Sequence, residues 1–149
     1  MRRSKPITQW MPLSVQQLLP MLYAGALALF DVVTQSGQDV PSRDRGVSSD
    51  WRALSRSLSQ QLGKWDHCYE TFDPYEDPPP SPVVCSLSDG LTDICRDLSD
   101  GLAKWLRGER DDAVWEWRFG FATHWGRHAV STLRAIHTLA ADHDLGFPR

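Results

Sequence analysis

Residues 113–143, AVWEWRFGFATHWGRHAVSTLRAIHTLAADH, decide the fold of this chain. The segment contains three of the seven tryptophans and four of the five histidines. Asp111 and Asp112 precede it, where carboxylates favour the positive end of a helix dipole. At 100° per residue, the apolar side chains fall on one broad arc: Trp115, Phe119, Ala122, Trp125, Ala129, Val130, Leu133, Ile136 and Ala140. The pattern predicts one amphipathic helix of about thirty residues.

Three further segments have helical periodicity. The first begins at Ser14, which forms a capping box with Gln17, and stays apolar as far as Val33. A second follows Asp50, with an apolar stripe from Trp51 to Phe72. The third covers 87–107 and ends at Gly108, a residue suited to a helix C-terminus. We therefore expect four helices.

The connections between these helices differ in composition. Residues 36–49 are rich in Gly, Ser and Asp and predict a linker. Residues 73–86 contain five prolines, which predicts a stiff, extended crossover between the second and third helices. The sequence shows no strand-like alternation. It predicts an all-α, four-helix bundle with a long proline-rich crossover, as one domain over 14–143 after a loose N-terminal arm, 1–13.

Composition and charge limit the partners and the cellular compartment that we expect for the protein. The 149 residues carry a net charge of −3, so we expect no nucleic-acid partner. Three cysteines form no CxxC pair, and their odd number argues against a disulfide framework and for a reducing cytoplasm. The apolar run 21–30 is too short to cross a bilayer, so we expect no membrane association.

Candidate site residues face each other on the third and fourth predicted helices. The third contributes acidic side chains and the fourth histidines and other charged groups: Asp93, Asp97, Glu116, Arg118, His124 and His128. Carboxylates opposite a histidine pair at i and i+4 can hold a divalent metal in a helical bundle. The chain has no HExxH or ExxH motif. The alternative explanation is a set of interhelical ion pairs, with Arg118 matched to Asp93 or Asp97.

Three stretches resemble a family of small bacterial proteins known only as a domain of unknown function. They are DHCYETFDP at 66–74, LTDICRDL at 91–98 and, most distinctively, WEWRFGFATHWGRHA at 115–129. The resemblance covers about residues 51–140. It implies a helical, bacterial, cytoplasmic protein, and it implies no activity, so no catalytic role is transferred to any residue.

Two functional hypotheses follow from the sequence. The first is a non-enzymatic binding or interaction module, which recognises a protein or a small molecule with the polar seam between the third and fourth helices. The alternative is a metal-dependent hydrolase or metal-binding protein that uses Asp93, Asp97, His124 and His128, with Glu116 as a base. A homodimer whose partner covers the apolar first helix is a further possibility.

Overall fold

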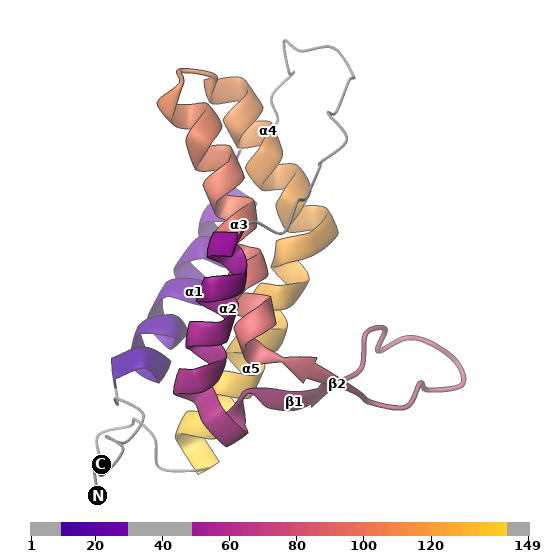
Figure 1. Ribbon diagram of the computed structural model, residues 1–149. Helices are drawn as coiled ribbons and strands as arrows, with labels where there is room; N and C mark the ends of the chain where they lie inside the picture. Colours follow the sequence, from indigo (N-terminus) through magenta and orange to yellow (C-terminus); the bar gives the residue numbers. More distant parts are fainter. Residues whose placement is uncertain (1–9, 30–48, 143–149) are drawn as a thin grey trace, which may run out of the picture.

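The computed structural model describes residues 10–29 and 49–142, which form a helical bundle with one small sheet (Figure 1). The elements in chain order are α1 Trp10–Ala28, α2 Ser49–Leu62, a 3-10 turn Gly63–Trp65, β1 His67–Glu70, β2 Val83–Ser86, α3 Leu87–Leu106, α4 Arg110–Gly120, a π-helical segment Phe121–Trp125 and α5 Gly126–Asp142. The predicted all-α class is therefore correct in its main feature, and the two strands are an addition to it.

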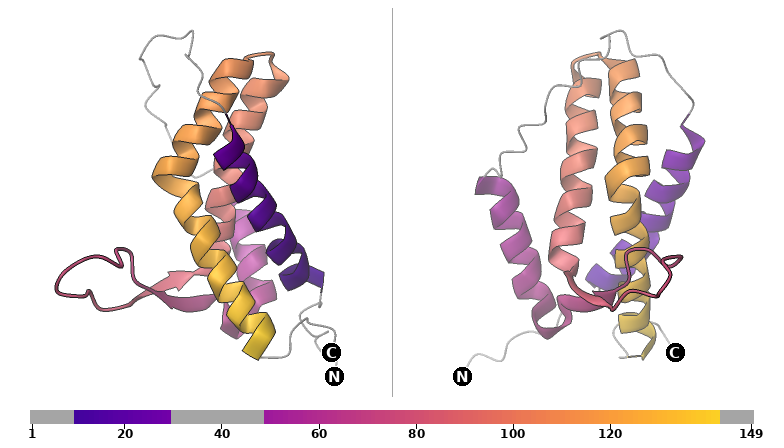
Figure 2. Two further views of the ribbon diagram at one scale, coloured as in Figure 1. Left: turned by 180° about the vertical axis from the view of Figure 1, so that it is seen from behind. Right: turned by 90° about the vertical axis from the view of Figure 1, so that its right-hand side faces the viewer.

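The long C-terminal helix predicted over 113–143 is present within the described residues. It begins at Arg110 and runs through α4, the π-helical segment (the π segment below) and α5 without a break, as one bent rod (Figure 2). With α1, α2 and α3 it makes four rods. α4 packs against α3, while α5 packs against both α1 and α3, and α2 contacts α3. α3 and the bent rod are thus the central pair of the bundle, with α2 packed on α3 and α1 packed on the rod.

Two apolar clusters fill the bundle. In the larger one, Leu19 and Ala26 of α1 pack against Ile94, Trp125 and Ala129, and the Trp125 side chain is 1% exposed. The smaller cluster lies at the hairpin end of the bundle and consists of Leu62, Leu87 and Ile136. Burial of these side chains is the main stabilising contribution to such a fold.

The predicted buried arc of the last helix is only partly correct. Ala129, Ile136 and Ala140 are buried as expected, whereas Phe119 is 42% and Val130 is 53% exposed, and Glu116 is buried. The sequence pattern assumed a uniform 100° per residue. A π-helical turn closes its hydrogen bonds from i to i+5 and holds more residues, so it rotates the residues before it relative to those after it.

The predicted proline-rich crossover is wrong, because residues 67–86 form a β-hairpin. β1 and β2 pair antiparallel, from His67 opposite Ser86 to Glu70 opposite Val83. The Leu87 amide donates to the Asp66 carbonyl, which shows that α3 begins where α2 ends. The connection therefore returns to the same end of the bundle, and the five prolines lie in the projecting loop, where no strand partner needs their missing N–H.

Asp66 fastens this junction to the start of α3. Its carboxylate accepts hydrogen bonds from the Ser88 amide (2.8 Å) and the Ser88 hydroxyl (2.9 Å), and its side chain is buried. Ser86 is the N-cap of α3 and accepts from the Asp89 amide. The carboxylate also suits the positive end of the helix dipole.

The N-terminal predictions are tested only in part. α1 begins at Trp10, so residues 10–13, which were expected in the loose arm, are helical instead. Residues 1–9 of the arm and 36–48 of the linker lie outside the described part of the chain. Within the described residues, no helix has both the length and the hydropathy that a bilayer span requires.

Candidate metal centre

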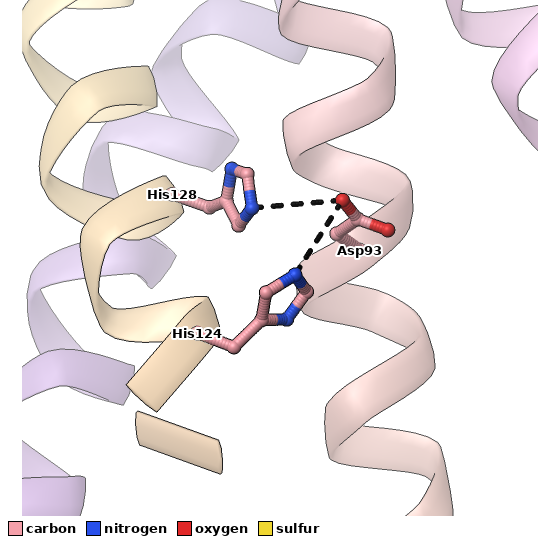
Figure 3. Close-up of side chains that lie close together, drawn as sticks. All are labelled: Asp93, His124 and His128. Carbon is pink, nitrogen blue, oxygen red and sulfur yellow. Dashed lines mark ion pairs between the residues drawn. The ribbon is translucent and has the colours of Figure 1, made fainter. Parts of the chain in front are cut away.

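Two aspartates and two histidines meet where α3 packs against the bent rod. Asp93 and Asp97 are one turn apart on α3, and His124 and His128 are one turn apart on the π segment and α5. Figure 3 shows both imidazole rings directed at the Asp93 carboxylate. The structure therefore brings together four of the six residues that the sequence singled out.

Three side chains of this group offer ligand atoms to a common point. His128 Nε2 lies 3.5 Å from Asp93 Oδ2, and His124 Nε2 lies 3.9 Å from the same oxygen. One potential ligand atom from each of the three residues falls within 4.8 Å of the other two. A metal about 2.0–2.2 Å from each atom would hold them about 3.4 Å apart in tetrahedral geometry. Small side-chain movements are therefore sufficient to seat an ion.

Asp97 fixes the orientation of the His124 ring. Its Oδ2 lies 2.7 Å from His124 Nδ1, and the Asp97 side chain is 1% exposed. A carboxylate accepts hydrogen bonds, so a neutral imidazole in this contact would carry its proton on Nδ1. Nε2, on the Asp93 side of the ring, is then the nitrogen that His124 would offer to a metal. Carboxylate–histidine pairs of this kind commonly stand behind metal ligands.

Arg96 binds the other oxygen of the Asp93 carboxylate. The guanidinium donates to Asp93 Oδ1 from three residues further along α3. Oδ2, the oxygen that faces both histidines, remains oriented toward them. Arg96 was not among the residues predicted from the sequence, although its i, i+3 spacing from Asp93 was the available signal.

The surroundings of His128 lower its pKa and so favour the neutral imidazole that metal binding requires. Burial lowers its pKa first, and the neighbouring His124 lowers it further, against the opposite effect of Asp93, Glu70 and Asp97. Glu70 belongs to β1, so the hairpin adds a carboxylate to the surroundings of the centre. Because the hairpin was not expected, nothing in the sequence pattern placed Glu70 near the histidines.

Two glycines permit the π segment that carries His124. A Cβ on Gly126 would collide with the Phe121 carbonyl, and one on Gly120 would come within 3.1 Å of the Trp125 ring and 3.6 Å of Asp97 Oδ2. π-helical turns inside α-helices are frequent at functional sites, and this one sets the ring position of His124.

Glu116 and Arg118 lie outside the cluster. Glu116 is buried and pairs with Lys104 of α3, with 2.7 Å between Oε2 and Nζ. Lys104 is about two turns beyond Asp97, so Glu116 is not positioned to act as a base for this group. The Arg118 guanidinium donates to the Leu29 carbonyl, at the C-terminal end of α1. It anchors α1 to the rod.

A family model described as a domain of unknown function (DUF5063) matches residues 7–142. The chain belongs to the DUF5063 family. This confirms the resemblance drawn from the sequence. No curated protein matches the chain.

Among solved structures, the chain is similar to the crystal structure of protein BF1032 from Bacteroides fragilis. The two share 22% sequence identity and a TM-score of 0.68, over 91% of this chain and 78% of the other. At this identity the likeness shows that the DUF5063 chain shares a fold with BF1032, and it says nothing about the chemistry of the site.

The geometry gives this DUF5063 chain the elements of a two-histidine, one-carboxylate centre. The side chains of Asp93, His124 and His128 are 25%, 24% and 36% exposed. Their partial exposure leaves one side of the group accessible to water. Two imidazoles and a carboxylate suit Zn²⁺, Fe²⁺ and other divalent first-row metals.

Proposed function

We propose that this DUF5063 protein binds a divalent transition metal through Asp93, His124 and His128. One observation carries the proposal: two imidazole Nε2 atoms are directed at the same carboxylate oxygen from a helix that faces it. A mere ion-pair network does not require both rings to present the same nitrogen. It also does not require a buried carboxylate behind one of them.

The arrangement supports an open metal site in preference to a closed structural one. Structural zinc sites usually have four protein ligands, whereas catalytic sites have three and leave a position for water or substrate. Three protein ligands and partial exposure correspond to the second type. A metal held in this way supplies a Lewis acid and lowers the pKa of bound water, which is the chemistry of metal-dependent hydrolases.

The interaction module that the sequence also suggested receives less support. Its expected surface was the polar seam between α3 and the bent rod, and outside the Asp–His cluster this seam contains the pair of Lys104 and Glu116. Because the Glu116 side chain is nearly inaccessible, this pair offers little to a partner.

Metal titration tests the proposal directly. The purified protein, stripped with a chelator, is titrated with Zn²⁺ and Mn²⁺ by calorimetry, and with Fe²⁺ under anaerobic conditions. We expect one ion per chain and a rise in melting temperature, because an ion that binds only the folded state stabilises it. His128→Ala and Asp93→Asn are expected to lower the affinity at least about 10-fold.

Two matched variants control for general effects. His67→Ala removes an exposed histidine from β1, and Asp100→Asn removes an exposed aspartate from α3; both are expected to retain wild-type affinity. The proposal would be overturned if none of the three ions binds while far-UV circular dichroism shows that the protein is folded and helical. Equal losses in the site and control variants would also overturn it.

A further inference from the structure

Two cysteines are directly opposite each other at the base of the hairpin. The strand register pairs Cys68 of β1 with Cys85 of β2. Opposite residues on antiparallel strands point to the same face, with Cα atoms about 4.5 or 5.5 Å apart in the two pair types. A disulfide requires Cα atoms about 4.4–6.8 Å apart. The backbone thus holds the two residues within the range for a bond in either pair type.

The surroundings keep both thiols available and protonated. Both cysteines are free and only partly buried, and Cys68 packs against the apolar cluster that contains Leu62 and Leu87. Burial, followed by the hydrogen bond and the charge of Glu70, raises the pKa of Cys85 to about 11. Burial also raises the pKa of Cys68. Thiols in this state react slowly at neutral pH, so proximity and not thiolate reactivity must favour the bond.

We propose that Cys68 and Cys85 are a redox pair, which forms a reversible intramolecular disulfide by exchange with a small-molecule disulfide such as oxidised glutathione. The pair joins the two ends of the hairpin, and the third cysteine, Cys95, lies separately on α3. The odd number of cysteines is then explained by one pair and one single thiol. The inference is independent of metal binding.

The reaction proceeds by two exchanges. The thiolate of one cysteine attacks a sulfur of the small disulfide, forms a mixed disulfide and releases one small thiolate. The thiolate of the other cysteine then attacks the protein sulfur of that mixed disulfide and releases the second small thiol. In total the protein loses two protons and two electrons. One small disulfide is reduced to two thiols.

Formation of the bond has a structural consequence at the hairpin. It cross-links β1 to β2 and encloses residues 69–84, which restricts the unfolded chain and is expected to raise the melting temperature. It also removes the Cys85 thiol, which forms a hydrogen bond with Glu70. The high pKa of both sulfurs makes them poor leaving groups, so the bond is expected to be reduced slowly once formed.

Incubation in glutathione redox buffers, followed by intact mass and peptide mapping, tests the pair. We expect the native protein to lose two hydrogens in mass and to yield a cross-linked peptide that contains Cys68 and Cys85. The Cys95→Ser variant is expected to behave in the same way, whereas Cys68→Ser and Cys85→Ser are expected to stop at a mixed disulfide or not to react. Circular dichroism confirms that each sample is folded.

Three results would each overturn the inference. They are stable glutathione adducts on both cysteines of the wild-type protein, a cross-link that includes Cys95, and no mass change even in the most oxidising buffer at alkaline pH. In the last case, the two strands would hold the sulfurs in an orientation that prevents the bond.

Discussion

At the scale of single residues, Asp97 is expected to affect metal binding indirectly, through the His124 ring that it orients. It contacts His124 Nδ1 at 2.7 Å and lies behind the ring, away from the three ligand atoms. Asp97→Asn keeps the size of the side chain but removes its charge, and an amide can also reverse and present a donor. We expect the affinity for Zn²⁺ to fall about 10–100-fold, as for other outer-shell partners of metal ligands.

Calorimetry measures this loss, with Asp100→Asn on the exposed part of α3 as the matched control. If Asp97→Asn binds Zn²⁺ as tightly as the wild-type protein does, the carboxylate has a structural role only. In that case the tautomer of His124 is set by the metal itself.

The free energy of unfolding is expected to depend on pH through a second residue, the buried aspartate Asp66. Burial raises its pKa, but hydrogen bonds from Ser59 and Ser88 outweigh this effect, so the net pKa lies below the ordinary value of 3.8. A carboxylate with a lowered pKa stabilises the fold above its unfolded pKa and loses this contribution as the pH falls through its folded pKa. Asp66→Asn is therefore expected to lower the free energy of unfolding by about 1–3 kcal/mol at pH 7.

Below pH 3.8 the difference between this variant and the wild-type protein should shrink, because only the wild-type side chain becomes protonated. Urea unfolding at pH 7 and at pH 3 measures both values. A difference that stays constant over this range would show that shape and not charge makes Asp66 important.

At the scale of elements, α3 and α4 approach closely at one glycine. The Trp117 indole covers Gly101, and its Nε1 donates to the Leu98 carbonyl at 3.0 Å. A Cβ at position 101 would overlap this ring. Gly101→Ala is therefore expected to displace Trp117 and to lower the free energy of unfolding by roughly 1–3 kcal/mol.

Gly25 provides the matched control, because a Cβ there meets nothing within 4 Å. Gly25→Ala on α1 should have the opposite effect and raise stability by up to about 1 kcal/mol, since alanine favours a helix. Chemical unfolding monitored by tryptophan fluorescence compares the two. Equal stabilisation by both substitutions would contradict the close packing of Trp117.

The same elements show how far sequence patterns extend. Periodicity identified all four rods and the pairing of α3 with the last one, because an apolar stripe must face a partner. It extended the second rod to Phe72, however, whereas α2 ends at Leu62. The same pattern therefore predicted that Asp93 and Asp97 lie opposite His124 and His128. It misplaced Glu116, because a uniform helical period cannot anticipate a π-helical turn, which depends on how Trp125, Gly120 and Gly126 pack in three dimensions.

At the scale of the whole molecule, the hairpin is the part that the sequence did not predict. Its strands have four residues each, too short for a clear alternation, and five prolines nearby suggested an extended chain. The two strands can pair only because α3 begins next to the end of α2, and this proximity is visible only in the structure. For this reason, the contributions of Glu70 and of the Cys68–Cys85 pair could be recognised only from the structure.

Replacement of the loop tests whether the bundle depends on it. Residues 71–82 are exposed almost throughout, while Glu70 and Val83 close the register of the two strands. An Asn-Gly turn in place of 71–82 suits a two-residue hairpin. Because shorter loops cost less entropy to close, we expect the free energy of unfolding to stay the same or to rise by up to about 1.5 kcal/mol.

Chemical unfolding and Zn²⁺ titration of the shortened protein check this expectation together. Unchanged metal affinity is expected, since all three proposed ligands lie on α3, the π segment and α5. A loss of stability above about 1 kcal/mol exceeds the usual effect of a surface change and would mean that the proline-rich loop packs on the bundle. A loss of affinity alone would instead mean that the loop contributes to the centre.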